Sequence, residues 1–502
     1  MTAEHERSTV TETAHYGLII LLTSAVGLVS VLSNRLTSRV KIPVPLLVLV
    51  GAALAVNVAP DLHAPPERTV ERVVTVALVV ILFEGGMHIG WSRLREAVAP
   101  TLVVGVLGTF LTTAAAALLL HLAFGFEWYV SVLVATAVAP TDPAVVFSVL
   151  GQREVAGRAG TILEGESGAN DPVGIALMVS LIMAGSLNAT AFGGVGLEFL
   201  LQMAVGAVFG VVGGVVLIWF TRRMPLPSEA LYPLRTLACG LMLYGVTALA
   251  HGSGFLAVFV AGIVIGDARA PYKREVERFH SALASLSEIV AFVVLGSTID
   301  LHTLARSDVL VPGLILGVVL AFVIRPVVVG ACLAPARLRR SERAFVVFAG
   351  LKGAVPILLG ELLRVADVPE AERLYGIVVV VVIFSVLVQG SLVPTVAARL
   401  GLPMRQVHPE PWALGMRLRH EPGGVHYLTV SRGSASEGRT IEEVADRAGD
   451  VWVSLVVRES RLVPVRGDTV LAAGDHVMVL ADPDLESILR TTFGEPDFTA
   501  EA

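Results

Sequence analysis

The chain has 502 residues, of which 54% are hydrophobic and only 16% are charged. Soluble globular proteins carry about 25% charged residues, so this composition excludes a soluble globular protein. Long uninterrupted apolar runs predict membrane-spanning helices rather than the alternating strands of a membrane β-barrel. The formal net charge of −6 indicates no partner by itself, and we expect the lipid bilayer and no nucleic acid polymer.

Apolar segments of membrane-spanning length follow one another through residues 1–400, which we interpret as the transmembrane domain. Since one crossing needs about 20 residues, we expect a polytopic α-helical membrane protein with about thirteen transmembrane helices. Their predicted ranges are 16–34, 43–59, 70–89, 98–122, 128–149, 161–185, 195–220, 232–250, 254–267, 279–299, 309–333, 343–363 and 373–398.

Basic residues are distributed unequally between the two sets of connecting loops. One set carries Arg35, Arg39, Lys41, Arg93, Arg95, Arg153, Arg158, Arg222, Arg223, Arg235, Arg269, Lys273, Arg274, Arg278, Arg337, Arg339, Arg340 and Arg343. The other set carries only Arg68, Arg72, Arg306, Arg364 and Arg373. Because basic loops stay on the cytoplasmic side, we expect a multi-pass protein of the cell (inner) membrane, with its N-terminus outside and its C-terminus in the cytoplasm.

The pattern changes after residue 400. Residues 401–424 are rich in Pro, Arg and His and read as a linker, and residues 425–495 predict a small α+β cytoplasmic domain. Its predicted elements are strands at 425–430, 451–457 and 476–481, a hairpin at 461–465, and helices at 440–448 and from 484 onwards. A domain this small is marginally stable alone, which favours dimerisation through it.

Polar residues stand where an apolar helix is expected, within the segment 161–184. A charged side chain at the middle of a membrane costs about 2.5–3.5 kcal/mol on insertion scales, so such residues require partners or a function. At helical spacing Ser167 and Asp171 share one face, and Glu166 and Asn170 share the adjacent face. We therefore predict that Asp171 carries either a proton or a metal cation.

Two predicted helices are interrupted at corresponding places, 128–149 by Pro140 and Pro143 and 343–363 by Gly and Pro residues around Lys352. Paired interruptions of this kind indicate a transporter built from inverted repeats, with its site at the breaks. A break frees backbone carbonyls for a cation and leaves two helix ends whose dipoles need compensation. Asp142 and Lys352 would supply that compensation.

Simpler interpretations exist for several of these residues. The prolines of 128–149 could merely kink that helix, Glu84 could lie near the membrane interface, and Lys352 could be structural. Arg325 could extend its side chain to the surface, although its position within a helix favours a buried pair with Glu166. Two further acids near helix ends are interpreted as structural or gating groups: Glu288 and Glu361.

Five motifs occur in the order of a known family. They are Leu82–Gly86, Thr141–Pro143, Glu166–Ser167 with Asn170–Pro172, Arg325, and Gly350–Ala354. Together they resemble the NhaP/NHE branch of monovalent cation:proton antiporters, over roughly residues 16–400. Lys352 departs from the family pattern, in which Arg is more frequent at that position.

The resemblance implies an NhaA-like antiporter fold and assigns roles to these residues. Asp171 would be the shared cation and proton site, with Ser167, Glu84 and the Thr141 backbone as further ligands of a monovalent cation. Asp142 would assist at the helix crossover, and Glu166 and Arg325 would form a buried structural pair. Asn170 stands where electrogenic relatives have a second aspartate, which implies electroneutral exchange. No cofactor beyond the transported cation and proton is implied, and the family is typically homodimeric.

The C-terminal segment resembles a TrkA-C (RCK-C) domain through Gly438–Ile441, Val463–Pro464 and Ala473–Val477. This resemblance implies dimerisation and the sensing of a small-molecule regulator, with a nucleotide as one candidate. Because such domains occur mainly on potassium transporters, it favours K⁺/H⁺ exchange over Na⁺(Li⁺)/H⁺ exchange.

Two other classes of function are weighed against an antiporter. A regulated cation channel would need repeated pore loops with a filter sequence, and the sequence contains none. An intramembrane enzyme would need a nucleophile with its base, or a metal motif such as His-Glu-x-x-His. The 12 histidines form no such motif, so we expect a transporter and not an enzyme.

Overall fold

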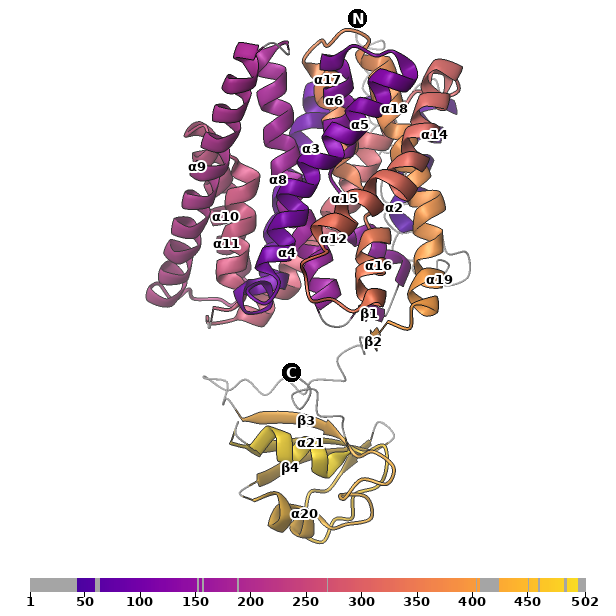
Figure 1. Ribbon diagram of the computed structural model, residues 1–502. Helices are drawn as coiled ribbons and strands as arrows, with labels where there is room; N and C mark the ends of the chain where they lie inside the picture. Colours follow the sequence, from indigo (N-terminus) through magenta and orange to yellow (C-terminus); the bar gives the residue numbers. More distant parts are fainter. Residues whose placement is uncertain are drawn as a thin grey trace, which may run out of the picture. The chain divides into compact units, whose positions relative to one another are not determined.

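The computed structural model describes residues 43–58, 64–150, 153–155, 158–186, 189–268, 270–402, 404–406, 424–449, 451–458, 461–482 and 485–494. The chain forms two compact units, Met1–His408 and Pro409–Ala502 (Figure 1). The predicted helix at 16–34 and most of the predicted linker lie outside the described residues.

The first unit is a bundle of long helices (Figure 1). Its first half contains α2 (Val44–Val58), α3 (Glu67–Leu94), α4 (Val98–Leu102), η1 (Val103–Gly108), α5 (Thr109–Phe124), α6 (Trp128–Val138), α7 (Pro143–Leu150), α8 (Arg158–Ala184) and α9 (Ala189–Arg223). Its second half contains α10 (Leu231–Leu249), α11 (Gly254–Gly266), α12 (Lys273–Ser297), α13 (Leu301–Leu304), α14 (Ser307–Val319), η2 (Leu320–Ile324), α15 (Arg325–Cys332), α16 (Arg340–Phe348), α17 (Ala354–Val365), α18 (Ala371–Phe384), η3 (Ser385–Gly390) and α19 (Ser391–Arg399).

These helices occupy the predicted segments from 43–59 onwards, with shifted ends. Helix α12 begins at Lys273, six residues before the predicted start at 279, because its first turns are charged and a hydropathy window excludes them. Eight helical stretches of the described residues are long and apolar enough to cross a membrane. The predicted total of thirteen crossings therefore stays a prediction.

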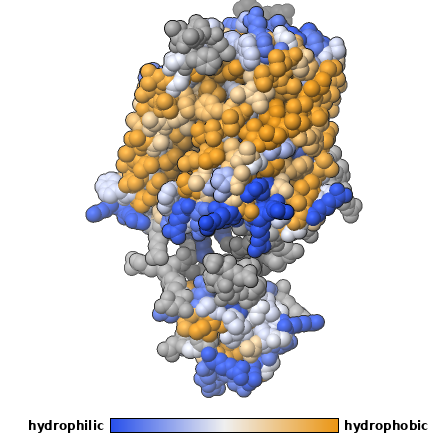
Figure 2. Space-filling view, viewed as in Figure 1, coloured by the Kyte–Doolittle hydropathy of each residue, from blue (hydrophilic) through white to orange (hydrophobic). Residues whose placement is uncertain are grey.

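The outside of the helical unit is apolar. Figure 2 shows a broad band of hydrophobic side chains across the visible face of this unit, with hydrophilic side chains along its lower and upper edges. Helix α9 contributes strongly to the band, since Leu200, Val208 and Trp219 are all more than half exposed. Soluble proteins do not expose apolar surface on this scale, so the band is the lipid-facing surface.

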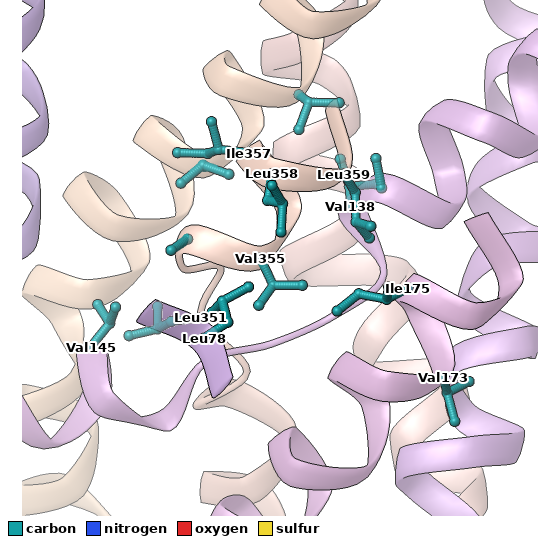
Figure 3. Close-up of a cluster of buried hydrophobic side chains, with 14 of the residues drawn as sticks. Leu78, Val138, Val145, Val173, Ile175, Leu351, Val355, Ile357, Leu358 and Leu359 are labelled. Atoms are coloured by element: carbon teal, nitrogen blue, oxygen red, sulfur yellow. The ribbon is translucent and has the colours of Figure 1, made fainter. Parts of the chain in front are cut away.

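Two helices are broken at the level of the core. Helix α6 ends at Val138 and α7 starts at Pro143, while α16 ends at Phe348 and α17 starts at Ala354. The predicted interruptions are thus present at both places. Pro143 is the first residue of α7, a position where its missing N–H costs no hydrogen bond. Buried side chains from α3, α6, α7, α8 and α17 gather around the breaks (Figure 3).

A short strand pair lies at one end of the helical unit. Strand β1 (Arg153–Val155) follows α7, and strand β2 (Met404–Gln406) follows α19. The two strands pair antiparallel, with Val155 opposite Met404. This pairing fixes the end of α19 beside the connection between α7 and α8.

The second unit is a four-stranded antiparallel sheet with two helices. The strands are β3 (Val425–Thr429), β4 (Val451–Arg458), β5 (Arg461–Val463) and β6 (His476–Ala481), in the order β3-β6-β4-β5. Helices α20 (Ile441–Ala448) and α21 (Glu486–Phe493) contribute Val444 and Phe493 to a core with buried strand residues such as Val456. The strands and helices predicted from the sequence are confirmed.

Candidate functional site at the crossed helix breaks

The two breaks meet in the interior of the helical unit. The backbone N–H of Asp142 donates a hydrogen bond of 2.8 Å to the carbonyl oxygen of Leu351. The Lys352 ammonium, 3% exposed, donates to the carbonyl oxygens of Ala139 and Pro140 at 2.8 and 3.0 Å. These carbonyls have no helical partner because α6 ends there, so Lys352 compensates the negative end of α6.

Asp142 compensates the opposite kind of helix end. Its carboxylate Oδ1 accepts a hydrogen bond of 2.8 Å from the backbone N–H of Ala144, in the first turn of α7. Asp142 is thus bound to the positive N-terminal end of α7, and Lys352 to the negative C-terminal end of α6. This arrangement is the one expected from the sequence for Asp142 and Lys352.

Two glycines of the second break allow this close approach. A Cβ atom on Gly353 would overlap the carboxylate of Asp142, and a Cβ atom on Gly350 would overlap the guanidinium of Arg325. Neither glycine is in the left-handed backbone region. They are required here for space, so that charged groups can pack directly against the backbone.

Helix α8 carries the central carboxylate beside this crossover. Asp171 is 6% exposed, and its Oδ2 accepts a hydrogen bond of 3.4 Å from the Ser167 hydroxyl. Its Oδ1 is buried, and no described residue donates a hydrogen bond to it. The charges of Asp142 and Lys352 act on Asp171. A buried carboxylate oxygen without a donor is a suitable ligand for a proton or a cation.

Asn170 connects α8 to the first break. Its Nδ2 donates to the Thr141 hydroxyl at 2.8 Å, and its Oδ1 accepts from the Thr141 backbone N–H at 3.4 Å. Both side chains are buried. These two hydrogen bonds hold the first break, at Thr141, in a fixed position relative to α8, the helix that carries Asp171.

Glu166 and Arg325 form a buried ion pair. The guanidinium nitrogens Nη1 and Nη2 donate to the two carboxylate oxygens at 2.7 and 3.1 Å, which is the bidentate geometry of strong pairs. Arg325 also donates to the carbonyl oxygens of Val347 and Val346, at 2.9 and 3.1 Å, near the end of α16. The pair predicted from the sequence is present, and it ties α8 to the second break.

Glu84 lies apart from this cluster. It is half-buried on α3. Among the described residues no hydrogen bond or ion pair joins Glu84 to Asp171. The structure therefore brings together Asp171, Ser167, Asn170, Thr141, Asp142 and Lys352, and leaves Glu84 outside their direct contacts.

Two residues support the second break that the sequence analysis did not single out. The Ser385 hydroxyl accepts from the Lys352 backbone N–H at 3.1 Å and donates to Gln389 Oε1 at 3.1 Å. The Gln389 amide in turn donates to the Phe348 carbonyl at 2.5 Å. Both side chains are buried in η3. Their spacing of four residues within an otherwise apolar segment was the available signal.

A buried carboxylate at two crossed, charge-compensated helix breaks in a lipid-facing helical bundle defines the class of membrane ion transporters with interrupted helices. The family model for the transmembrane part of sodium/hydrogen exchangers matches residues 19–399, and the chain belongs to this family. A TrkA-C domain model matches residues 425–492.

Named relatives resemble almost the whole chain. The K(+)/H(+) antiporter NhaP of Alkalimonas amylolytica is 30% identical over 497 residues, covering 96% of this chain and 85% of that protein. The K(+)/H(+) antiporter NhaP2 of Shewanella sp. (strain MR-4) is 30% identical, with 96% and 84% covered. Among solved structures, the sodium proton antiporter MjNhaP1 of Methanocaldococcus jannaschii has a TM-score of 0.65 at 19% identity, covering 77% of this chain and 99% of that one. That likeness shows the membrane antiporter fold.

Proposed function

We propose that this protein is an electroneutral monovalent cation/proton antiporter of the cell membrane, with K⁺ favoured over Na⁺. The observation that carries the proposal is Asp171, a buried carboxylate with one oxygen bound to Ser167 and the other without a hydrogen-bond donor among the described residues. A proton or a dehydrated monovalent cation satisfies that oxygen, and the two exclude each other because they need the same lone pairs.

The transport cycle follows from this competition. Asp171 loses its proton on the side of higher pH and takes up one cation, the loaded element moves so that the site faces the other side, and a proton there displaces the cation. One proton is exchanged for one monovalent cation, so the net charge of the site is the same in both loaded states. Asn170 supports this stoichiometry because it is an amide bound to Thr141 and adds no second titrating carboxylate.

The surrounding residues have separate roles in this proposal. Ser167 and the Thr141 backbone supply further oxygen ligands, and Glu84 is the further ligand that the resemblance implies, although among the described residues no hydrogen bond or ion pair joins it to Asp171. Asp142 and Lys352 hold the crossover, and Glu166 with Arg325 holds α8 against the second break. The two broken helices would be equivalent members of an inverted repeat.

The choice of K⁺ rests on the named relatives. Those that cover 96% of this chain, its C-terminal part included, are called K(+)/H(+) antiporters. The Na(+)/H(+) antiporter ApNhaP of Aphanothece halophytica is 27% identical and covers 76% of this chain, which keeps Na⁺(Li⁺)/H⁺ exchange as the alternative. We further propose that the N-terminus lies outside, that residues 425–495 form a cytoplasmic regulatory domain with a nucleotide ligand, and that the protein is a homodimer.

The test uses purified full-length protein in liposomes with an imposed pH gradient and a fluorescent pH reporter. Potassium and sodium are titrated separately on the wild type and on Asp171→Asn, with the exposed Asp367→Asn as matched control. We expect Asp171→Asn to abolish exchange, the control to leave it unchanged, and K⁺ to act at lower concentration than Na⁺. Full exchange by Asp171→Asn would overturn the assignment of the site.

The pH dependence of transport gives a second test. Because protons and cations compete for Asp171, exchange should be bell-shaped in pH, falling at both the acidic and the alkaline end. A flat profile between about pH 6 and 9 would count against a shared site. A chain truncated after residue 408, which keeps the β1–β2 strand pair, separates the exchange reaction from regulation, since it should retain exchange and lose any response to nucleotides.

A further inference from the structure

Two buried polar side chains lie beside the second break. Ser385 and Gln389 are 4% and 2% exposed and belong to η3, a π-helical segment between α18 and α19. Segments of this kind are rare and occur frequently at functional sites. Buried hydroxyl and amide groups need hydrogen-bond partners, and both of these side chains find partners on the interrupted backbone between α16 and α17.

Three hydrogen bonds in series cross this break. The Lys352 backbone N–H donates to the Ser385 hydroxyl at 3.1 Å, and this hydroxyl donates to Gln389 Oε1 at 3.1 Å. Gln389 Nε2 then donates to the Phe348 carbonyl oxygen at 2.5 Å. In a continuous α-helix each N–H donates to the carbonyl four residues earlier, so the Lys352 N–H would bind the Phe348 carbonyl directly. The two side chains therefore replace the backbone hydrogen bond that the break removes.

The first break is held in a comparable way. The helix that follows it, α8, supplies Asn170, whose amide donates to the Thr141 hydroxyl at 2.8 Å and accepts from the Thr141 N–H at 3.4 Å. Segment η3 likewise belongs to the helical stretch that follows the second break. In both halves of the unit, the helix after the broken helix thus carries an amide side chain bound to the break. This correspondence indicates that Gln389 serves the second break as Asn170 serves the first.

The position of the second break matters because two contacts of the crossover start from it. The Leu351 carbonyl oxygen accepts from the Asp142 N–H at 2.8 Å, and the Lys352 ammonium donates to two carbonyl oxygens at the end of α6. If the Lys352 N–H bound the Phe348 carbonyl directly, residues 349–352 would be wound into α16. The Leu351 carbonyl and the Lys352 side chain would then change position, and both contacts with the first break would be lost.

We propose that Ser385 and Gln389 are positioning residues of the exchange site, which keep the second break unwound and so hold the Lys352 ammonium and the Leu351 carbonyl against the first break. This inference rests on the proposed function, since the crossover serves the exchange at Asp171. Neither side chain binds the transported ions, and both act through the backbone of the second break.

The first experiment compares the maximal exchange rates of wild type, Ser385→Ala and Gln389→Met in liposomes with equal amounts of inserted protein. Each variant interrupts the series of hydrogen bonds, so each should lower the rate by roughly fivefold or more. Because the bonds are in series, the double variant should be no slower than the slower single variant, whereas independent contacts would multiply their losses. Multiplied losses overturn the proposal, as do wild-type rates in both single variants.

The pH profile of exchange separates positioning from a general loss of folded protein. A smaller folded fraction lowers the rate by the same factor at every pH. Displacement of the Lys352 ammonium instead removes a positive charge from the crossover, where the carboxylates are Asp142, Asp171 and Glu166, the last paired with Arg325. Protons should then compete with K⁺ at higher pH, and the acid limb of the profile should move upward by about 0.5 pH unit. A uniformly lower rate with an unshifted profile overturns the proposal.

Ser391→Ala and Gln202→Met are the matched controls, one for the lost hydroxyl and one for the lost amide. The Ser391 hydroxyl donates to the Val388 carbonyl of its own helical stretch at 3.0 Å. Gln202, 9% exposed, donates to Ser180 and Glu198 at 3.5 and 3.2 Å. Both controls should keep the wild-type rate and pH profile. Losses in the controls equal to those in Ser385→Ala and Gln389→Met overturn the proposal.

If Gln389→Met does not reach the membrane, the variants of Ser385 decide the question. Ser385→Thr keeps the hydroxyl and should keep most of the rate and the wild-type pH profile, whereas Ser385→Ala should keep neither. Equal losses in the threonine and alanine variants overturn the proposal. Full exchange by Asp171→Asn would instead refute the proposed function, whatever the variants of Ser385 do.

Discussion

The backbone N–H of Asp142 and the carbonyl oxygen of Leu351 are joined by a 2.8 Å hydrogen bond, although the two residues belong to different broken helices. This bond brings Asp142 of the first break and Lys352 of the second break close together in the interior of the helical unit. Asp142 binds an N–H group of α7, and Lys352 binds carbonyl groups at the end of α6. The crossover is therefore a single polar unit, and displacement of one break should displace the other.

Gly353→Ala should disrupt this unit. The added Cβ would overlap the Asp142 carboxylate, so the two breaks would have to separate. Misplacement of a binding site by about 1 Å can cost roughly a hundredfold in rate, and we expect the exchange rate to fall at least about tenfold. Gly330→Ala is the control, because a Cβ there meets nothing within 4 Å. Liposome transport by equal amounts of protein gives the comparison, and wild-type activity in Gly353→Ala would mean that the breaks are not tightly packed.

Lys352→Met should destabilise the protein as well as impair transport. It leaves the carbonyl oxygens of Ala139 and Pro140 without their donor, and each unsatisfied buried group costs about 1–3 kcal/mol. We expect a lower Tm in detergent and little remaining exchange. Lys273→Met is the comparison, since Lys273 also donates to a backbone carbonyl, that of Gly266, but is half-buried. Equal Tm losses in the two variants would contradict a special role for Lys352.

Glu166 and Arg325 should behave as one structural unit. Removal of one partner of a buried ion pair leaves an uncompensated charge and costs about 3–5 kcal/mol. Glu166→Gln and Arg325→Met should therefore each lower Tm strongly, and the double variant should recover part of the loss. A double-mutant cycle on Tm measures this coupling. Additive losses would mean that the contact contributes little, despite its 2.7 Å distance.

The sequence was sufficient to predict the polar residues of α8 and both helix breaks. Charged residues and prolines in apolar segments are strong signals, because the bilayer core tolerates neither without compensation. The pairing of Glu166 with Arg325 could also be predicted, since both lie within predicted membrane helices and have opposite charge. The predicted compensation of helix ends by Asp142 and Lys352 has its counterpart in specific hydrogen bonds.

The sequence was less informative about contacts set by the packing of distant helices. Glu84 is interpreted as a cation ligand through the resemblance, and among the described residues no hydrogen bond or ion pair joins it to Asp171. Glu288 was interpreted as a structural or gating group because it lies near a helix end. In the structure Glu288 lies within α12, nine residues before that helix ends at Ser297. Hydropathy gives the length of α12 but not its rotation.

The C-terminal domain, with strands β3 to β6, allows a prediction about pH that is independent of transport. Asp475 has no exposed side-chain surface. Burial alone would raise the pKa of its carboxyl, but two hydrogen bonds from Arg458, at 2.7 and 2.8 Å, and one from the Ala472 backbone N–H hold that pKa below its usual value. A carboxylate with a depressed folded-state pKa contributes stability above its unfolded pKa of about 3.9, and the contribution is lost as the pH falls through the folded-state value.

The free energy of local opening of β4 and β6 should therefore be constant between about pH 5 and 8 and should decrease below about pH 4. Hydrogen exchange of the full chain, followed by mass spectrometry, measures this free energy strand by strand. Arg458→Met should lower it by about 2 kcal/mol at neutral pH, less than for a fully buried pair because the arginine side chain is 41% exposed. In that variant Asp475 is buried without its cation, so acid should no longer destabilise the strands. Arg461→Met, at an exposed arginine of β5, is the control and should change neither the free energy of opening nor its pH dependence. If acid destabilises the strands of Arg458→Met as much as those of the wild type, a group other than Asp475 is responsible.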